Sequence, residues 1–363
     1  MMKKVMILAN NDVGLYKFRR ELIENLIQKY EVHIVLPYGS FVDDFVRMGC
    51  IFHETTMERR GTNPVKDFSL LHNYWKLVRK IRPNAVLTYT IKPNVYGGMV
   101  CAIHNIPYIA NITGLGTAVE NAGFMQVLTT NLYKFALHKA AMVFFQNEEN
   151  QKFMTQRGIV KGEWDLLPGS GVNLHQYQQM QYPAGETIDF LFVARVMKEK
   201  GIDHYLDAAR YISQKYPNTC FHICGGCDGD YMDILRSESD KGHIIYHGLV
   251  GDMLPMYQQC ACTVHPTYYP EGMSNVLLES CASGRPIITT DRPGCREIVE
   301  DGRNGFVCKQ QNSDDLIHQI ERFLALSHEE RKQMGQYARE KVEREFDRNI
   351  VIEKYLRELE KHG

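Results

Sequence analysis

The stretch from His265 to Val307, HPTYYPEGMSNVLLESCASGRPIITTDRPGCREIVEDGRNGFV, decides the fold of this chain. It begins where a short apolar strand over 262–265 is predicted to end. The residues Gly-Met-Ser-Asn and the apolar run after them have the pattern of a helix that opens just after a strand. Another apolar strand is predicted over 286–289. Strand, helix and strand in this order are typical of a parallel α/β sheet.

The same stretch contains two glutamates, Glu271 and Glu279, eight positions apart. Eight residues of α-helix advance about 12 Å and return to nearly the same face, so one carboxylate is expected at the helix mouth and the other two turns further on. Unpaired backbone N–H groups at a helix mouth favour an anion. Here they would belong to Gly272, Met273, Ser274 and Asn275. This layout fits a nucleotide sugar, with sugar hydroxyls on one carboxylate, the diphosphate on the amides and ribose hydroxyls on the other carboxylate.

Length and composition describe a globular protein of two domains. A chain of 363 residues is too long for one ordinary hydrophobic core, and 44% hydrophobic with 23% charged residues is typical of globular proteins. The formal net charge of -1 argues against a dedicated nucleic-acid binder, which usually has a strong basic excess. No apolar stretch reaches the ~18 residues of a membrane span. The scattered cysteines indicate a reducing cytoplasm, and the opening MMKKVMILANND is interpreted as a first strand rather than a signal peptide.

Short apolar runs alternate with longer amphipathic segments along the whole chain, which is the pattern of a doubly wound α/β protein. In the first half we predict strands over 5–9, 32–36, 51–54, 85–89, 108–112 and 142–146. In the second half we predict strands over 188–194, 219–224, 244–246, 262–265, 286–289 and 305–308. The polar segment 176–185, which contains Pro183, is the predicted linker.

This organisation predicts two Rossmann-like domains that face each other across a cleft. The first spans 1–180 and the second spans 186–346, and the C-terminal helix, 347–363, is expected to pack back on the first. In doubly wound sheets, ligands bind beyond the carboxyl ends of the strands. Functional residues are therefore expected directly after the predicted strands.

Two cations follow the first strand of the second half. Arg195 comes directly after the run 188–194, and Lys200 with Gly201 comes just before the next helix. Cations at a strand end beside a glycine turn suit a diphosphate. A solvated charged loop is the alternative, and the expected Glu271 helix mouth in the same crevice favours the diphosphate. After another strand, the backbone of His247, Gly248, Leu249 and Val250 could contact a base edge, whereas the His247 side chain is interpreted as structural.

Two short motifs have the spacing of metal ligands, and neither is favoured as a metal site. Asp228-Gly229-Asp230 lies in a glycine loop after a strand and is interpreted as a turn and helix cap. Cys224-Gly-Gly-Cys227 lacks the second CxxC or the His pair of a zinc site, and is interpreted as a buried strand cysteine entering a glycine loop. We therefore expect no metal and no other cofactor.

Several motifs of the second half occur together and resemble the donor-binding half of the family 4 glycosyltransferases. The matching residues are Arg195 with Lys200-Gly201, His247-Gly248-Leu249-Val250, Pro270-Glu271-Gly272, Glu279 through Gly284-Arg285-Pro286, and Asp301-Gly302 with Gly305-Phe306-Val307. That family is the large retaining group with the GT-B fold of two Rossmann-like domains. The resemblance covers about residues 190 to 310, and the motifs are highly specific as a set.

The resemblance implies a role for each matching residue. Arg195 and Lys200 would hold the diphosphate of the donor, Glu271 would contact the transferred sugar, and Glu279 would contact the ribose. A departing nucleoside diphosphate concentrates negative charge on its β-phosphate, which two cations and a helix amino end can stabilise without a metal. Retention implies that the acceptor hydroxyl attacks from the leaving-group face. A covalent intermediate on Glu271 is the rival mechanism, and the sequence leaves both open.

The first half resembles a narrower subgroup, which elongates polyprenyl-diphosphate-linked glycans. The resemblance rests on NNDVGLYKFRR at 10–20 and NITGLGTA at 111–118. Many relatives have a glycine pair after the first strand and a histidine after the fifth, whereas this chain has a single Gly14 and has Thr113-Gly114. These residues are still candidates for the acceptor or phosphate loop, because Gly14 could let the loop approach a phosphate and the Thr113 hydroxyl can form a hydrogen bond. Such an acceptor carries a diphosphate and a lipid tail. Its expected partners are Lys17, Arg19, Arg20 and Lys92, with an ordinary helix surface as the alternative for the first three.

These observations predict a retaining GT-B glycosyltransferase that uses no metal. It would move a hexose or N-acetylhexosamine from a UDP-sugar to a polyprenyl-diphosphate-linked saccharide, during assembly of a surface polysaccharide such as capsule or O-antigen. The expected location is the cytoplasm, peripherally at the inner membrane face, with no nucleic-acid partner. A nucleotide-sugar epimerase of the same fold and a non-catalytic sugar-binding protein are the alternatives.

Overall fold

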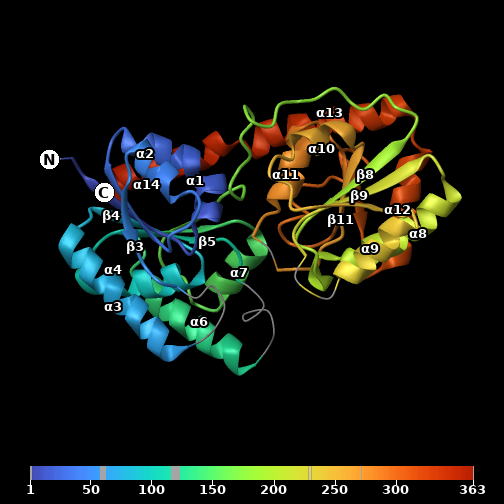
Figure 1. The fold of residues 1–363 in the computed structure, drawn as a ribbon. Coiled ribbons are helices and arrows are strands. Elements are labelled where there is room, and N and C mark those ends of the chain that lie inside the picture. The colour runs from blue at the N-terminus through green and yellow to red at the C-terminus, as the bar shows by residue number, and fades with distance from the viewer. Residues whose placement is uncertain are drawn as a thin grey trace. The chain divides into compact units, whose positions relative to one another are not determined.

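The computed structural model describes residues 2–57, 63–115, 123–227, 229, 231–270 and 272–362. Its contacts divide the chain into two units, each built on one parallel sheet. The first unit, here the N-terminal domain, contains the residues up to Ser170, Gly272 with Met273, and the residues from Asn349 onward. The second unit, the C-terminal domain, contains Gly171–Pro270 and Ser274–Arg348. Figure 1 shows both units.

The N-terminal domain has a seven-stranded parallel sheet in the order β3-β2-β1-β4-β5-β6-β7. Its strands are β1 (Lys4–Leu8), β2 (Glu31–Leu36), β3 (Ile51–Glu54), β4 (Ala85–Tyr89), β5 (Tyr108–Ile112), β6 (Met142–Phe145) and β7 (Trp164–Leu166). Its helices are α1 (Asp12–Ile27), α2 (Val42–Met48), α3 (Pro64–Ile81), the π-helix η1 (Pro93–Gly97), α4 (Gly98–His104), α6 (Phe124–Leu137), α7 (Glu148–Gln156) and α14 (Arg348–His362).

Both faces of this sheet are covered by apolar side chains. Val5 and Ile7 of β1 belong to one core cluster, which also contains residues of α1 and α14. Met6 and Leu8 belong to another, which contains residues of α3, α4 and α6. Because successive side chains of a strand point to opposite faces, the clusters lie on opposite sides of the sheet. This is why the strands are continuous apolar runs in the sequence.

The C-terminal domain has a six-stranded sheet in the order β10-β9-β8-β11-β12-β13. Its strands are β8 (Ile188–Val193), β9 (Thr219–Cys224), β10 (Ile245–Gly248), β11 (Cys262–His265), β12 (Ile287–Thr290) and β13 (Gly305–Cys308). Its helices are the 3-10 turn η2 (Lys198–Lys200), α8 (Ile202–Lys215), α9 (Met232–Asp240), α10 (Leu254–Gln259), α11 (Asn275–Ala282), α12 (Ser313–Ala325) and α13 (His328–Glu345). The parallel strands and alternating helices confirm the predicted fold class.

The structure differs from the sequence prediction at the predicted linker. The contact-based division lies at Gly171, before the segment 176–185. That segment packs on the C-terminal domain, because Tyr182 is buried and its hydroxyl donates to the carbonyl of Ala261 at 3.1 Å. The buried guanidinium of Arg285 also donates to the carbonyl of Gln181 at 2.8 Å. The segment is polar because most of its side chains are exposed, while its backbone accepts hydrogen bonds from a buried arginine.

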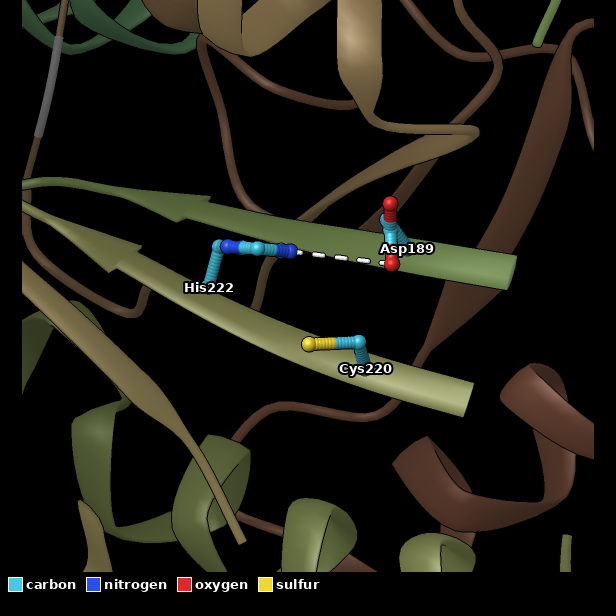
Figure 2. Close-up of side chains that lie close together, drawn as sticks. All are labelled: Asp189, Cys220 and His222. Atoms are coloured by element: carbon cyan, nitrogen blue, oxygen red, sulfur yellow. Dashed lines mark ion pairs between the residues drawn. The ribbon is translucent and has the colours of Figure 1, made fainter. Parts of the chain in front are cut away.

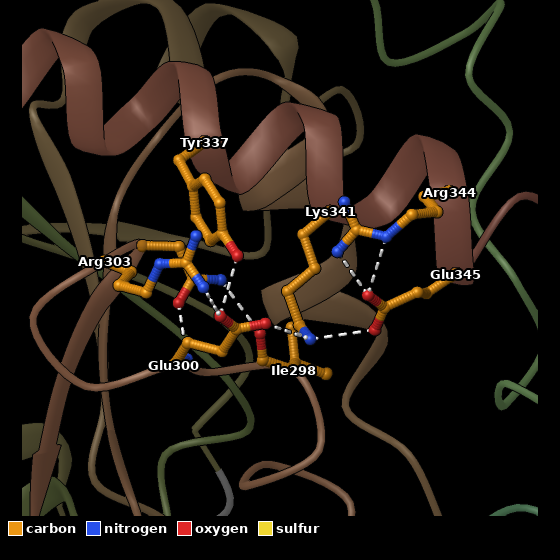
Figure 3. A network of polar contacts seen from close by, with 8 residues as sticks. Ile298, Glu300, Arg303, Tyr337, Lys341, Arg344 and Glu345 are labelled. Carbon is orange, nitrogen blue, oxygen red and sulfur yellow. Dashed lines mark hydrogen bonds and ion pairs between the residues drawn. The ribbon is translucent and has the colours of Figure 1, made fainter.

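A polar network ties the loop before β13 to helix α13 (Figure 3). One oxygen of Glu300 accepts from the Tyr337 hydroxyl at 2.7 Å, and the other accepts from Nζ of Lys341 at 2.9 Å. Lys341 also donates to Glu345 at 2.8 Å. The backbone N–H of Glu300 donates to Oδ1 of Asn304 at 2.6 Å. Hydrogen bonds from Lys341 and Tyr337 hold the pKa of Glu300 below its usual value, so the carboxylate stays charged and the loop stays attached.

Candidate functional site

The turn that carries Lys200 packs closely on the loop after β11. An added Cβ on Gly201, which has φ +78°, would overlap the carbonyl oxygen of Pro266, so only glycine allows this approach. The carbonyl of Glu199 accepts from the backbone N–H of Tyr268 at 2.9 Å. As a result, Nζ of Lys200 lies 4.8 Å from the ring centroid of Tyr269. A cation is thereby positioned beside the loop that leads toward Glu271.

Arg195 lies at the carboxyl edge of the same sheet, where three backbone segments meet. It follows β8, and its side chain is exposed. Gly225, with φ +149°, approaches the Ala194 carbonyl so closely that an added Cβ would overlap it. The N–H of Gly225 donates to the carbonyl of Gly248 at 2.7 Å. Glycines at 225 and 248 thus allow the ends of β8, β9 and β10 to pack together around the base of Arg195.

Glu279 lies on α11 and its carboxylate is held by tyrosines. Oε2 of Glu279 accepts from the hydroxyl of buried Tyr257 at 3.1 Å, and Tyr177 also hydrogen-bonds to this carboxylate. Burial, and next the charge of Glu279, raise the pKa of both tyrosines well above the usual value. Both hydroxyls therefore remain donors at neutral pH, and they orient the carboxylate for a further hydrogen bond.

The mouth of α11 differs from the sequence prediction. The helix begins at Asn275 with Ser274 as its N-cap, so Gly272 and Met273 precede it. The N–H of Ser274 donates to the carbonyl of Gly294 at 2.8 Å and is therefore already paired. The predicted anion contact stays a prediction for the N–H groups of Gly272, Met273 and Asn275. Glu271 lies outside the described residues.

Gly272 and Met273 make their contacts in the N-terminal domain. The side-chain amide of Asn147, which caps α7, donates to the carbonyl of Gly272 at 2.7 Å. An added Cβ on Gly272 would overlap the carbonyl oxygen of Thr113, and the Gln146 side chain is equally close. Gly272 is therefore required for steric reasons, and Thr113 contributes its backbone carbonyl to this contact. Gly114 follows with φ +141°.

The stretch around His247 forms strand β10 and the turn after it. His247 is exposed, and its Nε2 lies 2.9 Å from Nδ1 of His222. Gly248 has φ +66° and uses its carbonyl to accept from Gly225. Leu249 is 86% exposed, and Val250 packs beside the cluster of Leu191 and Tyr257. The interpretation of His247 as a structural histidine agrees with its contact to His222.

The predicted acceptor cations of the N-terminal domain are placed differently from the expectation. Arg19 is only 4% exposed; it donates to the carbonyl of Phe18 at 2.8 Å, and its guanidinium lies 5.1 Å from the ring centroid of Tyr89. It is therefore part of the core rather than a helix surface. Lys92 pairs with Asp67 at 2.7 Å and Arg20 pairs with Glu24 at 2.8 Å, and these pairs neutralise both cations.

Gly14 and Lys17 both lie within α1. Asn11 is the N-cap of this helix, and its Oδ1 accepts from the N–H of Gly14 at 2.6 Å. Gly14 is thus a residue of the first helical turn with a satisfied amide, and not a loop glycine open to a phosphate. Lys17 is exposed two residues before the buried Arg19. The difference arises because an Asn-Asn-Asp sequence caps a helix as readily as it forms a loop.

A buried polar network in the N-terminal domain was not predicted from the sequence. The amide of Asn111, on β5, donates to the Tyr355 hydroxyl at 2.6 Å and accepts from Gln146 at 3.2 Å. Asn94 donates to the Asn111 carbonyl at 2.8 Å and accepts from Thr88 at 2.6 Å. An asparagine inside the otherwise apolar run 108–112 was the available signal. These hydrogen bonds hold the carboxyl ends of β4, β5 and β6 rigidly.

Two motifs were predicted not to bind a metal in spite of their spacing, and the structure describes only one of them in full. Asp228 and Asp230 lie outside the described residues. Cys224 is buried and Cys227 is half-buried, and both are free thiols. The backbone of Cys227 forms a bridge with Val196.

Among the helices of the described ranges, none combines the length and apolar character that are needed to cross a membrane.

Both halves of the chain match known protein families. Residues 4–147 match the family described as Glycosyl transferase 4-like, and residues 178–341 match the family described as Glycosyl transferases group 1. The N,N'-diacetylbacillosaminyl-diphospho-undecaprenol alpha-1,3-N-acetylgalactosaminyltransferase of Campylobacter jejuni is 24% identical over 98% of this chain and 97% of the relative. The UDP-Gal:alpha-D-GlcNAc-diphosphoundecaprenol alpha-1,3-galactosyltransferase of Escherichia coli is 23% identical, over 85% of this chain and 83% of the relative.

Solved structures share the fold of the whole chain. Anabaena HepE, in complex with UDP and glucose, superposes with a TM-score of 0.81 at 15% sequence identity, over 99% of this chain and 100% of that one. A glycosyltransferase from Rickettsia africae superposes with a TM-score of 0.80 at 15% identity, over 99% of this chain and 98% of that one. These likenesses confirm the predicted two-domain fold.

Proposed function

We propose that this chain, which is a family 4 glycosyltransferase with the GT-B fold, moves a hexose or N-acetylhexosamine from a UDP-sugar to a polyprenyl-diphosphate-linked saccharide. The reaction would retain the anomeric configuration and belong to the assembly of a surface polysaccharide or glycan. The observation that carries the donor side is that one domain contains Arg195 at a strand end, the Lys200 turn beside Tyr269 and the tyrosine-held Glu279.

The donor chemistry follows from the charges of this domain. When the glycosidic bond to UDP breaks, negative charge grows on the β-phosphate oxygens. Lys200, fixed beside Tyr269, and the exposed Arg195 are suited to stabilise that charge, which is a transition-state contact. Glu279 is suited to accept hydrogen bonds from the ribose hydroxyls, because its tyrosine partners hold the carboxylate in place. We expect no metal to be needed for this step.

The acceptor side of the proposal rests on the relatives. The names of two relatives specify undecaprenol-diphosphate-linked sugars as acceptors. Both align with most of this chain, including the N-terminal domain. We propose front-face attack by the acceptor hydroxyl, with a donor phosphate oxygen taking its proton. A covalent intermediate on Glu271 is the alternative.

The proposal is tested by a transfer assay with a panel of UDP-sugars and a short polyprenyl-diphosphate-linked saccharide. We expect one of the donors to give a product. NMR should show an α-linkage when the donor is an α-linked UDP-sugar. Lys200→Ala and Glu271→Ala variants that remain folded should lose most turnover. Near-wild-type turnover in both would overturn the assignment. Incubation with UDP-N-acetylglucosamine alone tests the epimerase alternative, since an epimerase would form a new nucleotide sugar without an acceptor.

We also propose that the N-terminal domain binds the membrane surface through α3, α4 and α6. Exposed apolar side chains gather on these helices, with Val65 78% and Phe68 71% exposed on α3 and Phe135 58% exposed on α6. Further along α3, a hollow is lined by Trp75 with cationic residues, namely Lys76, Arg79 and Lys80. Apolar side chains with adjacent cations are suited to an anionic lipid surface.

Vesicle sedimentation tests this surface. The double variant Val65→Glu and Phe68→Glu should bind phosphatidylglycerol-containing vesicles at least ~10-fold more weakly than the wild type, because two apolar side chains no longer enter the interface. Val46→Glu is the matched control, since Val46 is 49% exposed on α2. Equal loss in the control, or unchanged binding in the double variant, would contradict the proposed surface.

A further inference from the structure

Three side chains with different ligand atoms converge on one face of the C-terminal sheet (Figure 2). Asp189 of β8 and Cys220 of β9 are direct register partners. His222 follows two residues after Cys220, so it projects from the same face of β9. The carboxylate oxygen, the thiol sulfur and the imidazole nitrogen all lie within 4.8 Å of one another. Neighbouring strands therefore bring together a mixed O, S and N ligand set.

The spacing of this cluster is compatible with metal ligands. Nε2 of His222 lies 3.6 Å from Oδ1 of Asp189, which is an ion-pair distance and longer than a direct hydrogen bond. Ligands about 2.0–2.3 Å from a tetrahedral zinc ion lie about 3.3–3.8 Å apart. A thiolate, an imidazole and a carboxylate are ligands that Zn²⁺ accepts together. The cluster is partly buried, with the His222 side chain 2% and the Asp189 side chain 15% exposed.

Neighbouring residues supply the outer contacts that metal sites require. Nδ1 of His222 lies 2.9 Å from Nε2 of His247, so His222 can bind a metal through Nε2 while it donates its other ring proton. The side-chain amide nitrogen of Gln259 lies 3.4 Å from both Asp189 Oδ2 and His222 Nε2. Rotation of this amide by half a turn exchanges its nitrogen and oxygen, and Oε1 then becomes available as a fourth ligand.

The cluster is distinct from the donor residues. Asp189 is the second residue of β8, whereas Arg195 follows the carboxyl end of the same strand. Six residues of extended chain span about 20 Å. Cys220 likewise lies near the start of β9. A metal bound here would join β8, β9 and α10 toward the amino ends of these strands, whereas Arg195 follows the carboxyl end of β8.

We propose that Asp189, Cys220 and His222 bind one zinc ion, with Gln259 completing the coordination and His247 orienting His222. The ion stabilises the C-terminal domain and takes no part in sugar transfer. The proposal does not depend on the proposed function, because Asp189, Cys220, His222 and Gln259 have no substrate-binding role in it, and His247 is used here through its side chain and not through the backbone that was predicted to contact a base. It departs from the sequence-based expectation, which was that the chain holds no metal.

Cobalt titration tests the site directly. The full-length chain, without an affinity tag, is stripped of metal with a chelator under reducing conditions and titrated with Co²⁺, which gives a sulfur-to-metal charge-transfer band when a thiolate is a ligand. One equivalent should produce the band, and Zn²⁺ should abolish it. Cys220→Ser and His222→Gln should lose it. His247→Gln should keep it with a Kd raised about 10–100-fold, the range for loss of an outer partner.

Matched controls separate this site from other ligands. Cys227→Ser should keep the band, because Cys227 is another half-buried free thiol of the same domain. His362→Gln should also keep it, because the other described group with metal-ligand spacing, Glu163, Glu358 and His362, contains no sulfur. Absence of the band in the wild type, or an undiminished band in Cys220→Ser, would overturn the proposal. Zinc should also raise the Tm of the wild type and not that of Cys220→Ser.

Discussion

The two domains differ in how their predicted functional residues are built into the fold. In the C-terminal domain, Arg195 follows a strand end and Lys200 lies in the turn before α8, and glycine contacts determine the backbone at both places. In the N-terminal domain, Arg19 is buried in the core and Lys92 is paired with Asp67. Both sets of residues have the same charge and looked equally available in the sequence. The difference teaches that a cation predicted from its place on a helix can be buried in the core or paired with a carboxylate, which the sequence does not reveal.

The largest expected effect concerns Lys200. Lys200→Ala should lower kcat/KM for sugar transfer by about 100–1000-fold, because it removes a charge contact formed to the leaving diphosphate. Steady-state kinetics with the preferred UDP-sugar measures this. Lys198→Ala, an exposed lysine of the same turn, should leave the rate nearly unchanged. Equal losses in both variants would show that the turn matters for its shape and not for the Lys200 charge.

A substitution of Gly225 tests whether close backbone packing determines the strand ends of the C-terminal domain. Gly225→Ala should destabilise the protein by about 3 kcal/mol, because its Cβ would overlap the Ala194 carbonyl at a φ of +149°. Urea unfolding measures the change. Gly226→Ala is the matched control, since its Cβ would meet no atom within 4 Å among the described residues. Similar stability of the two variants would contradict the close packing at this strand end.

A substitution of Arg19 tests whether this buried cation stabilises the core of the N-terminal domain or binds a ligand. Arg19→Ala should lower the free energy of unfolding by about 2 kcal/mol, because it leaves a cavity beside Tyr89 and Tyr355. Lys17→Ala, at an exposed position of the same helix, should change it by less than about 0.5 kcal/mol. A raised KM for the acceptor with unchanged stability would instead make Arg19 a ligand-binding residue.

The smallest expected effect is a gradual loss of stability in acid. Burial raises the pKa of Glu238, but hydrogen bonds from Arg210, His243 and Lys241 outweigh it and lower the pKa to about 2 from 4.5. A carboxylate with a lowered folded pKa contributes stability above its unfolded pKa and loses it as the pH falls. Stability should therefore decline between pH 4.5 and 2.

Urea midpoints as a function of pH measure this decline. Glu238→Gln should be less stable than the wild type at pH 7 and should lose less stability between pH 4.5 and 2. Glu340→Gln, an exposed glutamate of the same domain, serves as the control and should follow the wild-type profile. An identical acid decline in Glu238→Gln would exclude Glu238 as its source.

Much of the strand framework was predictable because it depends on local patterns. The runs 188–194 and 108–112 are apolar because both sheet faces are covered, and the structure has strands there. Strand β7 was missed, because Trp164–Leu166 is short and half exposed and lacks an apolar run. The linker was predicted over 176–185 because this segment is polar, but its exposed side chains belong to a backbone that Arg285, which is distant in sequence, holds on the C-terminal domain.

The candidate donor residues could be named from the sequence because they follow recognisable local elements. Arg195 follows a strand, Lys200 precedes a helix and Glu279 lies two turns into a helix. The sequence by itself determined the alternation of strands and helices and the places of these candidate residues along them. The reason is that hydrophobic periodicity and turn-forming residues are properties of neighbouring positions in the chain. Tertiary structure alone decided the burial of Arg19, the tyrosines on Glu279 and the meeting of Asp189, Cys220 and His222. The physical reason is that these contacts depend on strand register and helix-face packing between distant segments.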